Sequence, residues 1–228
     1  MITTILFDLD ETLFDFHKAE AIALSKTLTQ LGVEASQENI ALYSAINKKH
    51  WEMLEEGRIT RAQVLLGRFD ELFATLGADC QSTQAQKIYE HQLGIGHYFI
   101  PGAPELLQGL TDQYALYIVS NGTASVQEGR IKSSGIAPLF REIFISQKIG
   151  YNKPRKEFFD YCFARIPDFS KEKTIIIGDS LTSDMRGGNN AGIRTCWFNP
   201  REDERIDGIH IDYEVQKLEQ IPALLKEI

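Results

Sequence analysis

The stretch ILFDLDET at residues 5–12 places a short apolar run directly before two carboxylates. The run that leads into it, residues 2–7, has the length of a strand and shows no alternation of polar and apolar residues. Such runs are typical of parallel strands that are buried on both faces. Four further runs share this texture and end in small or polar residues, at 115–119, 143–145, 174–177 and 195–198.

Segments with helical patterning alternate with these runs from residue 100 onward. They lie at 104–110, 123–134, 156–165 and 183–191. Alternating strands and helices are typical of the α/β class, so we expect a doubly wound, Rossmann-like parallel sheet. Ligands of such sheets bind outside the carboxyl ends of the strands. The polar residues that follow the apolar runs are therefore the candidates for a site.

Residues 15–97 interrupt this alternation, because they contain no strand-like run. Apolar residues recur there at helical spacing, at Leu24, Leu28 and Leu31 and again at Leu65, Phe69, Leu72 and Leu76. We expect four helices in this segment, inserted as a cap between the first strand and the second. The predicted domains are a catalytic core of residues 1–14 and 98–228 and a helical cap of residues 15–97.

The composition limits the partners. Twenty-four Lys and Arg stand against 32 Asp and Glu, a formal net charge of −8. This balance argues against general affinity for nucleic acid polymers or anionic membranes. We expect no secretory signal and no membrane span, and three free thiols at Cys80, Cys162 and Cys196, since they lack disulfide or zinc spacing. These features favour a cytoplasmic protein, either a monomer or a weak homodimer.

Four carboxylates follow two of the predicted strands: Asp8 and Asp10 after the first, and Asp179 and Asp184 after the run at 174–177. Two like charges at about 4 Å repel by about 4 kcal/mol at an effective dielectric near 20. Carboxylates gathered without cations either raise their pKa values or bind a cation. Oxygen ligands of this kind suit Mg²⁺, so we expect a magnesium site at the strand ends.

Four motifs, in order along the whole chain, resemble those of the haloacid dehalogenase superfamily, phosphatase branch. They are Asp8-Leu9-Asp10-Glu11-Thr12, Ser120-Asn121, Lys153-Pro154 and Gly178-Asp179-Ser180-x-x-x-Asp184. The resemblance implies a Rossmann-like haloacid dehalogenase core with an inserted helical cap. A hinged helical lid could exclude water while a phosphoaspartate forms and admit one water for its hydrolysis, so we expect hinges near 15–17 and 99–102.

The resemblance implies a role for each motif. Asp8 is the expected nucleophile, which forms an aspartyl-phosphate, and Asp10 is the expected general acid and base. Lys153 is expected to neutralise developing charge, and Ser120 and the amides near Asn121 to hold phosphoryl oxygens. The metal is expected at Asp8, at Asp179 and at the backbone carbonyl of Asp10, with Asp184 in an outer shell or orienting Lys153. Thr12 is expected either in the phosphoryl site or as the cap of the next helix.

The presence of Asp10 argues against a dehalogenase, because dehalogenases of this superfamily lack an acid/base Asp two residues after the nucleophile. The motifs leave open a phosphomutase, a phosphatase of another small ester such as a sugar phosphate or phosphoglycolate, and a regulatory protein that binds phosphate without turnover.

The whole-chain pattern resembles the bacterial pyrimidine 5′-nucleotidase subgroup of this superfamily, in segments such as 8–16, 55–61, 118–122 and 178–184. This similarity implies a small phosphate monoester as substrate, a pyrimidine nucleoside monophosphate such as UMP, dUMP or dTMP, and a place in nucleotide metabolism. Phe14 and Phe16 are then candidates to stack on the base, the alternative being that they pack hinge against cap. We expect Trp51 to belong to the cap core.

Overall fold

A computed structural model describes all residues, 1–228. Its centre is a six-stranded parallel sheet with the strand order β3-β2-β1-β4-β5-β6. The strands are β1 (Thr4–Phe7), β2 (Ala115–Ser120), β3 (Glu142–Ile145), β4 (Thr174–Gly178), β5 (Arg194–Phe198) and β6 (Tyr213–Val215). The predicted α/β fold with a doubly wound sheet is confirmed. The order reverses between β1 and β4, and the crevice at such a switch is where these sheets bind ligands.

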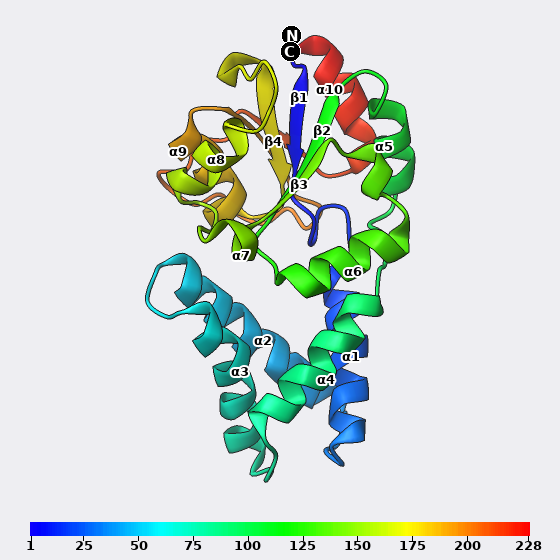
Figure 1. Cartoon of the computed structure of the whole chain (residues 1–228), viewed down its shortest axis with the longest axis vertical. Coiled ribbons are helices and arrows are strands. Elements are labelled where there is room, and N and C mark those ends of the chain that lie inside the picture. Colours follow the sequence, from blue (N-terminus) through cyan, green and yellow to red (C-terminus); the bar gives the residue numbers. More distant parts are fainter.

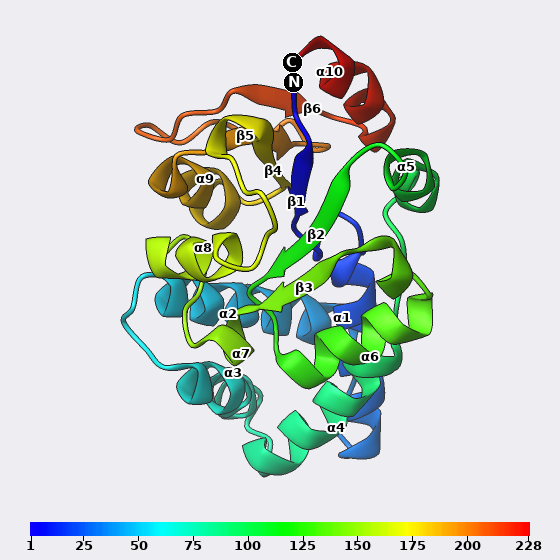
Figure 2. The same ribbon diagram turned by 45° about the horizontal axis from the view of Figure 1, so that its top comes forward.

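Both faces of the sheet are covered by helices, which explains why the strands are apolar throughout. Ile5 and Phe7 of β1 join one buried cluster with α5 (Ala103–Leu110) and α10 (Ile221–Glu227). Leu6 points to the other cluster, with α8 (Lys156–Phe163) and the end of α9 (Arg186–Ala191). Figure 2 shows these two helical layers on opposite sides of the strands. The remaining core helices are α6 (Ala124–Ser134) and the short α7 (Ser146–Ile149).

The segment after β1 folds into four helices, as predicted: α1 (Phe16–Gln30), α2 (Gln37–Glu55), α3 (Arg61–Leu76) and α4 (Ser82–Ile95). We call them the cap helices. They enclose an apolar cluster of their own, which includes Leu24, Leu28, Phe69 and Leu72. Figure 1 shows the cap helices facing the carboxyl ends of the strands, while both chain termini lie at the opposite end. The exact division into core and cap domains stays a prediction.

Two linkers join the cap helices to the sheet, and they run side by side. The amide of Asp15 donates to the carbonyl of Tyr98 at 2.8 Å, and the amide of Ile100 donates to the carbonyl of Leu13 at 3.0 Å. The rings of Phe14 and Phe99 pack edge to face with their centroids 5.2 Å apart. The two predicted hinges therefore lie against each other, so that any movement of the cap must bend both together.

Some elements differ from the predictions. The sequence did not predict β6, α7 or α10, because β6 has only three residues and the other two lack a long apolar period. The helix expected at 183–191 starts as a π-helical turn, Leu181–Met185, before α9. All three cysteines are free, as predicted. No helix is long and apolar enough to cross a membrane.

Candidate active site

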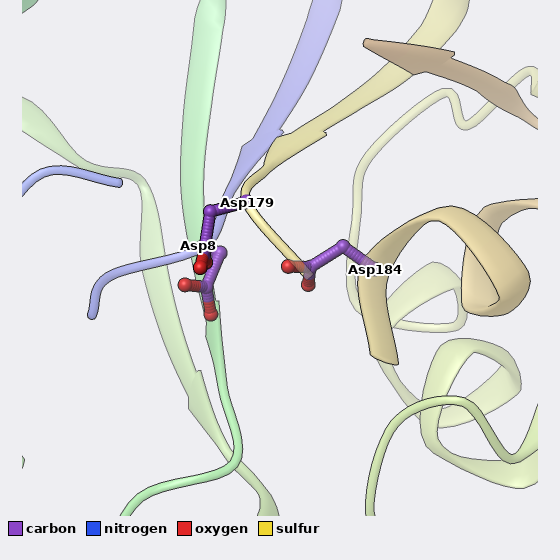
Figure 3. A group of neighbouring side chains, drawn as sticks. All are labelled: Asp8, Asp179 and Asp184. Atoms are coloured by element: carbon purple, nitrogen blue, oxygen red, sulfur yellow. The ribbon is translucent and has the colours of Figure 1, made fainter. Parts of the chain in front are cut away.

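Three carboxylates meet where β1 and β4 end side by side. Asp8 follows β1, Asp179 follows β4, and Asp184 lies in the π-helical turn; ligand oxygens from the three lie within 4.8 Å of one another. Figure 3 shows the Asp184 carboxylate approaching the other two from the opposite side. The sequence placed these residues at strand ends, and the register of β1 with β4 brings them together.

The approach of Asp184 depends on the glycine that ends β4. A Cβ atom at Gly178 would collide with the Asp184 carboxyl group. The same carboxylate accepts a hydrogen bond from the amide of Ser180 at 3.2 Å. The π-helical turn and the missing side chain together hold Asp184 against the strand end.

Lys153 supplies the positive charge in this cluster. Its Nζ atom donates to Asp8 Oδ1 and to Asp184 Oδ1, both at 2.6 Å, and to the carbonyl of Val119 at 2.7 Å. Burial acts to lower the pKa of Lys153, but Asp184 and Asp8 outweigh it and raise the pKa. The lysine therefore remains charged although its side chain is only 1% exposed.

One lysine does not balance three carboxylates, of which Asp8 and Asp184 are buried and Asp179 is half-buried. Burial raises the pKa of Asp8 to about 7, with Asp184 and Asp10 adding to the shift against Lys153. Burial, with the charges of Asp8 and Asp184, also raises the pKa of Asp179 well above its usual range. Such shifts indicate a site that lacks positive charge. The all-oxygen donor set fits Mg²⁺, for which Asp8 and Asp179 are suitable ligands.

Asp10 lies apart from this cluster and is held by α6. Its carboxylate accepts a hydrogen bond of 2.6 Å from Gln127 Nε2 and forms an ion pair with Arg130. The same Gln127 nitrogen donates to Ser120 Oγ at 2.8 Å, and the amide of Gly122 donates to that oxygen at 3.1 Å. Since Ser120 Oγ accepts both bonds, its own proton is free to be donated to a ligand.

Arg130 was missed by the sequence analysis. Its side chain is fully buried, and besides Asp10 it bonds the carbonyl of Gly96 at 3.1 Å. Its guanidinium lies 5.0 Å from the centre of the Phe14 ring and 5.9 Å from that of Phe16. Arg130 thus joins Asp10 to both linkers of the cap. No sequence signal marks it, because an arginine in a polar helix is usually exposed.

Thr12 does not cap the following helix, so that alternative is wrong. The N-cap of α1 is Asp15, whose side chain accepts from the amide of Lys18 at 2.9 Å. Thr12 Oγ1 instead accepts from the amide of Asp179 at 3.1 Å and lies 3.4 Å from Asp8 Oδ2. Thr12 therefore ties the ends of β1 and β4 together, and its place in the phosphoryl site stays a prediction.

Asn121 is fixed beside the lysine. Its side chain accepts from the Lys153 amide at 2.8 Å and donates to the Lys153 carbonyl at 3.0 Å. It also donates to Glu55, at the end of α2, at 3.3 Å. Glu55 further accepts from Thr182 at 3.2 Å, and burial raises its pKa to about 7. A carboxyl group of the cap helices thus bridges the loop that carries Asn121 and the π-helical turn that carries Thr182.

Arg61, the first residue of α3, makes four hydrogen bonds from the cap to the core. It donates to the carbonyls of Asn121 and Gly122 at 3.1 and 3.3 Å. It also donates to Ser146 Oγ at 2.7 Å and Asn152 Oδ1 at 2.8 Å. These acceptors surround the segment that carries Ser120, so the structure has the cap closed over this end of the sheet.

We expect Arg61→Ala to lower kcat/KM about 10- to 100-fold with every substrate, because bonds to a charged group contribute about 1.5–3 kcal/mol and hold the closed form. Steady-state kinetics measure the loss. The control is Arg58→Ala in the loop just before α3, since Arg58 is exposed and pairs only with Glu56. Equal activity of the two variants would contradict this role of Arg61.

A cavity of about 290 Å³ lies between the cap helices and the strand ends. Its lining includes Asp8, Asp10, Ser120, Asn121, Lys153, Asp179 and Asp184, so the structure brings most of the predicted site residues to one space.

Of the two candidate aromatic residues, Phe16 lines the cavity, but Phe14 is fully buried against Phe99 and does not. The prediction that Phe14 stacks on a base is therefore wrong, because its ring does not reach the cavity. Trp51 lines the cavity beside Arg61 and is not part of the cap core, contrary to the prediction.

Residues 5–198 match the family described as haloacid dehalogenase-like hydrolase. The chain is 38% identical to the pyrimidine 5′-nucleotidase PynA of Streptococcus pneumoniae, over 95% of this chain and 92% of that protein. It is 30% identical to the pyrimidine 5′-nucleotidase YjjG of Escherichia coli, over 97% and 96%. The crystal structure of the HAD-hydrolase YfnB from Bacillus subtilis, bound to magnesium, superposes with a TM-score of 0.94 at 41% identity, over 98% of both chains.

Proposed function

Since the chain belongs to the haloacid dehalogenase-like hydrolases, we propose that it is a Mg²⁺-dependent phosphatase of pyrimidine nucleoside 5′-monophosphates. The observation that carries the chemistry is the geometry around Asp8, whose carboxylate borders a cavity shared with Lys153, Asp10 and Ser120. Two relatives that match nearly the whole chain are pyrimidine 5′-nucleotidases, which supports the substrate class.

In the proposed first step, a carboxylate oxygen of Asp8 attacks phosphorus and the bond from phosphorus to the 5′ oxygen breaks. Asp10 donates a proton to that oxygen, and the nucleoside leaves. In the second step water attacks phosphorus, Asp10 takes its proton, and inorganic phosphate departs as Asp8 is regenerated. Lys153 and Ser120 hold the phosphoryl oxygens as their negative charge moves.

Asp8 and Asp179 would hold Mg²⁺, with Asp184 orienting Lys153, to which it is bonded at 2.6 Å. A bound magnesium ion supplies positive charge that lets an anionic nucleophile approach an anionic phosphate. The raised pKa values of Asp8 and Asp179 support this proposal, because a cation would keep both carboxyls ionised. The magnesium-bound relative and the interdomain movement reported for it support both the metal and the mobile cap.

We expect phosphate release from UMP to stop when EDTA removes divalent cations and to return when Mg²⁺ is added in excess. A phosphate-release screen over UMP, dTMP, ribose 5-phosphate and phosphoglycolate measures both the metal dependence and the substrate ranking. Unchanged turnover in EDTA would contradict the metal proposal. A ranking led by a sugar phosphate or phosphoglycolate would contradict the nucleotide substrate and leave the covalent chemistry standing.

A further inference from the structure

The cavity continues from the strand ends into the interior of the cap helices, where it meets polar side chains. Glu20, Asn47, Arg68 and Gln86 come from α1, α2, α3 and α4 in turn, and all four line the cavity. We call them the cap polar cluster. Each is at most 8% exposed, although the surrounding core of the cap is apolar.

Hydrogen bonds join the cluster into a chain. Asn47 Nδ2 donates to Glu20 Oε1 at 2.7 Å. Arg68 donates to Asn47 Oδ1 at 2.8 Å and to Gln86 Oε1 at 2.7 Å. The guanidinium also lies over the Tyr89 ring, 4.9 Å from its centre. Four helices thus fix the positions of the guanidinium and of the two amide groups.

The cluster is unusual because apolar residues would stabilise such a helical interior at least as well. Its hydrogen-bonding capacity is also incompletely used, because Arg68 Nε is buried without a partner, as is the hydroxyl of the neighbouring Tyr89. Buried polar groups of this kind are costly unless something satisfies them. Arg68 and Tyr89 line a cavity that also borders Asp8, which points to a ligand that enters with its phosphate at the other end.

The charged residues that line the cavity indicate which chemical groups a ligand can place at its cap end. The charged cap residues that line the cavity include Glu20, Glu55 and Glu90 beside Arg68 and Lys48, so the cap side offers no excess of positive charge to a second anionic group. Amide and guanidinium groups instead match the alternating donors and acceptors along the edge of a neutral heterocycle. Trp51 and Phe16 supply flat apolar surfaces in the same cavity.

The size limits the ligand further. A volume of about 290 Å³ is at the lower end of ligand sites, which are typically about 300–1,000 Å³. We propose that the cap polar cluster recognises the hydrogen-bonding edge of the pyrimidine base of a nucleoside monophosphate whose phosphate lies at Asp8. This inference rests on the proposed function and deepens it, because it assigns the base to Asn47, Arg68 and Gln86.

The test compares UMP with ribose 5-phosphate, which keeps the phosphate and the sugar but lacks the base. The variants are Arg68→Met and Gln86→Met, which remove the polar groups. Methionine keeps the length of the glutamine side chain and is shorter than arginine. We expect each to lower the ratio of kcat/KM for UMP to kcat/KM for ribose 5-phosphate about 10- to 100-fold. Lys49→Met is the control, since Lys49 is an exposed cap residue that pairs with Glu71 and does not line the cavity.

The outcomes separate the inference from the proposed function. If wild type prefers UMP and the two variants keep that ratio, or lose both activities equally, the cluster is structural and the inference is overturned. If wild type shows no preference for UMP, the proposed substrate fails and the base site with it. Circular dichroism checks folding, and Gln86→Met carries the test alone if Arg68→Met does not fold, because Gln86 is the most exposed member of the cluster.

Discussion

Asp8→Asn will abolish turnover of every phosphate ester, by at least about 10³-fold, while the protein stays folded. The loss follows because the amide oxygen is a poor nucleophile and cannot form a phosphoenzyme; removing a covalent nucleophile in other hydrolases costs about this much or more. Folding should survive, since the Asp8 carboxyl is buried with a pKa raised to about 7, and a neutral amide relieves its repulsion with Asp184 and Asp10. Asparagine also retains an oxygen that can accept from Lys153.

The measurement has two parts. Phosphate release gives kcat/KM, and a thermal melt should show a midpoint equal to or above that of wild type. Acid-quenched wild type incubated with substrate should carry one added phosphoryl group by mass spectrometry, and the variant should carry none. Asp160→Asn is the matched control, because Asp160 is exposed on α8 and pairs only with Lys156. An Asp8→Asn protein as active as wild type would refute the covalent mechanism.

The sequence was sufficient to predict the carboxylate cluster, because Asp8 and Asp179 directly follow buried strands. In a parallel sheet the carboxyl ends of neighbouring strands share one edge, so residues far apart in sequence meet there. The motif that contains Asp179 also contains Asp184, so Asp184 was predicted at the same site although it lies in the turn of helix that follows the strand. The four cap helices could likewise be predicted from the helical spacing of their apolar residues.

The residues that orient the predicted site residues could not be predicted from the sequence. Gln127 and Arg130 lie on α6, which contains few apolar residues, so nothing in the pattern shows which polar side chains face inward. Phe14 and Phe16 look alike in sequence, yet the pairing of the two linkers buries the first against Phe99 and leaves the second at the cavity. Such differences arise from contacts between distant segments and not from local periodicity.

The second large effect is expected at Asp10, and it should depend on the leaving group. A nucleoside 5′ oxygen is a poor leaving group that needs a proton, whereas 4-nitrophenolate departs without one. General acid catalysis typically contributes about 10²–10⁴-fold, so Asp10→Asn should lower kcat with UMP by about that factor. The fall in the rate of phosphoenzyme formation should be much smaller with 4-nitrophenyl phosphate. Single-turnover kinetics with both substrates separate these cases.

The same variant should also trap the intermediate, because Asp10 takes the proton from the water that hydrolyses it. With 4-nitrophenyl phosphate we therefore expect a burst of nitrophenolate and a phosphoenzyme that persists after quenching. Asp15→Asn is the matched control: it changes the same residue type five positions away, and asparagine caps a helix as well as aspartate. Arg130→Met should repeat the leaving-group pattern in weaker form, since Arg130 and Gln127 hold the Asp10 carboxylate. An equal loss with both substrates would show instead that Asp10 acts on binding or folding and not as the proton donor.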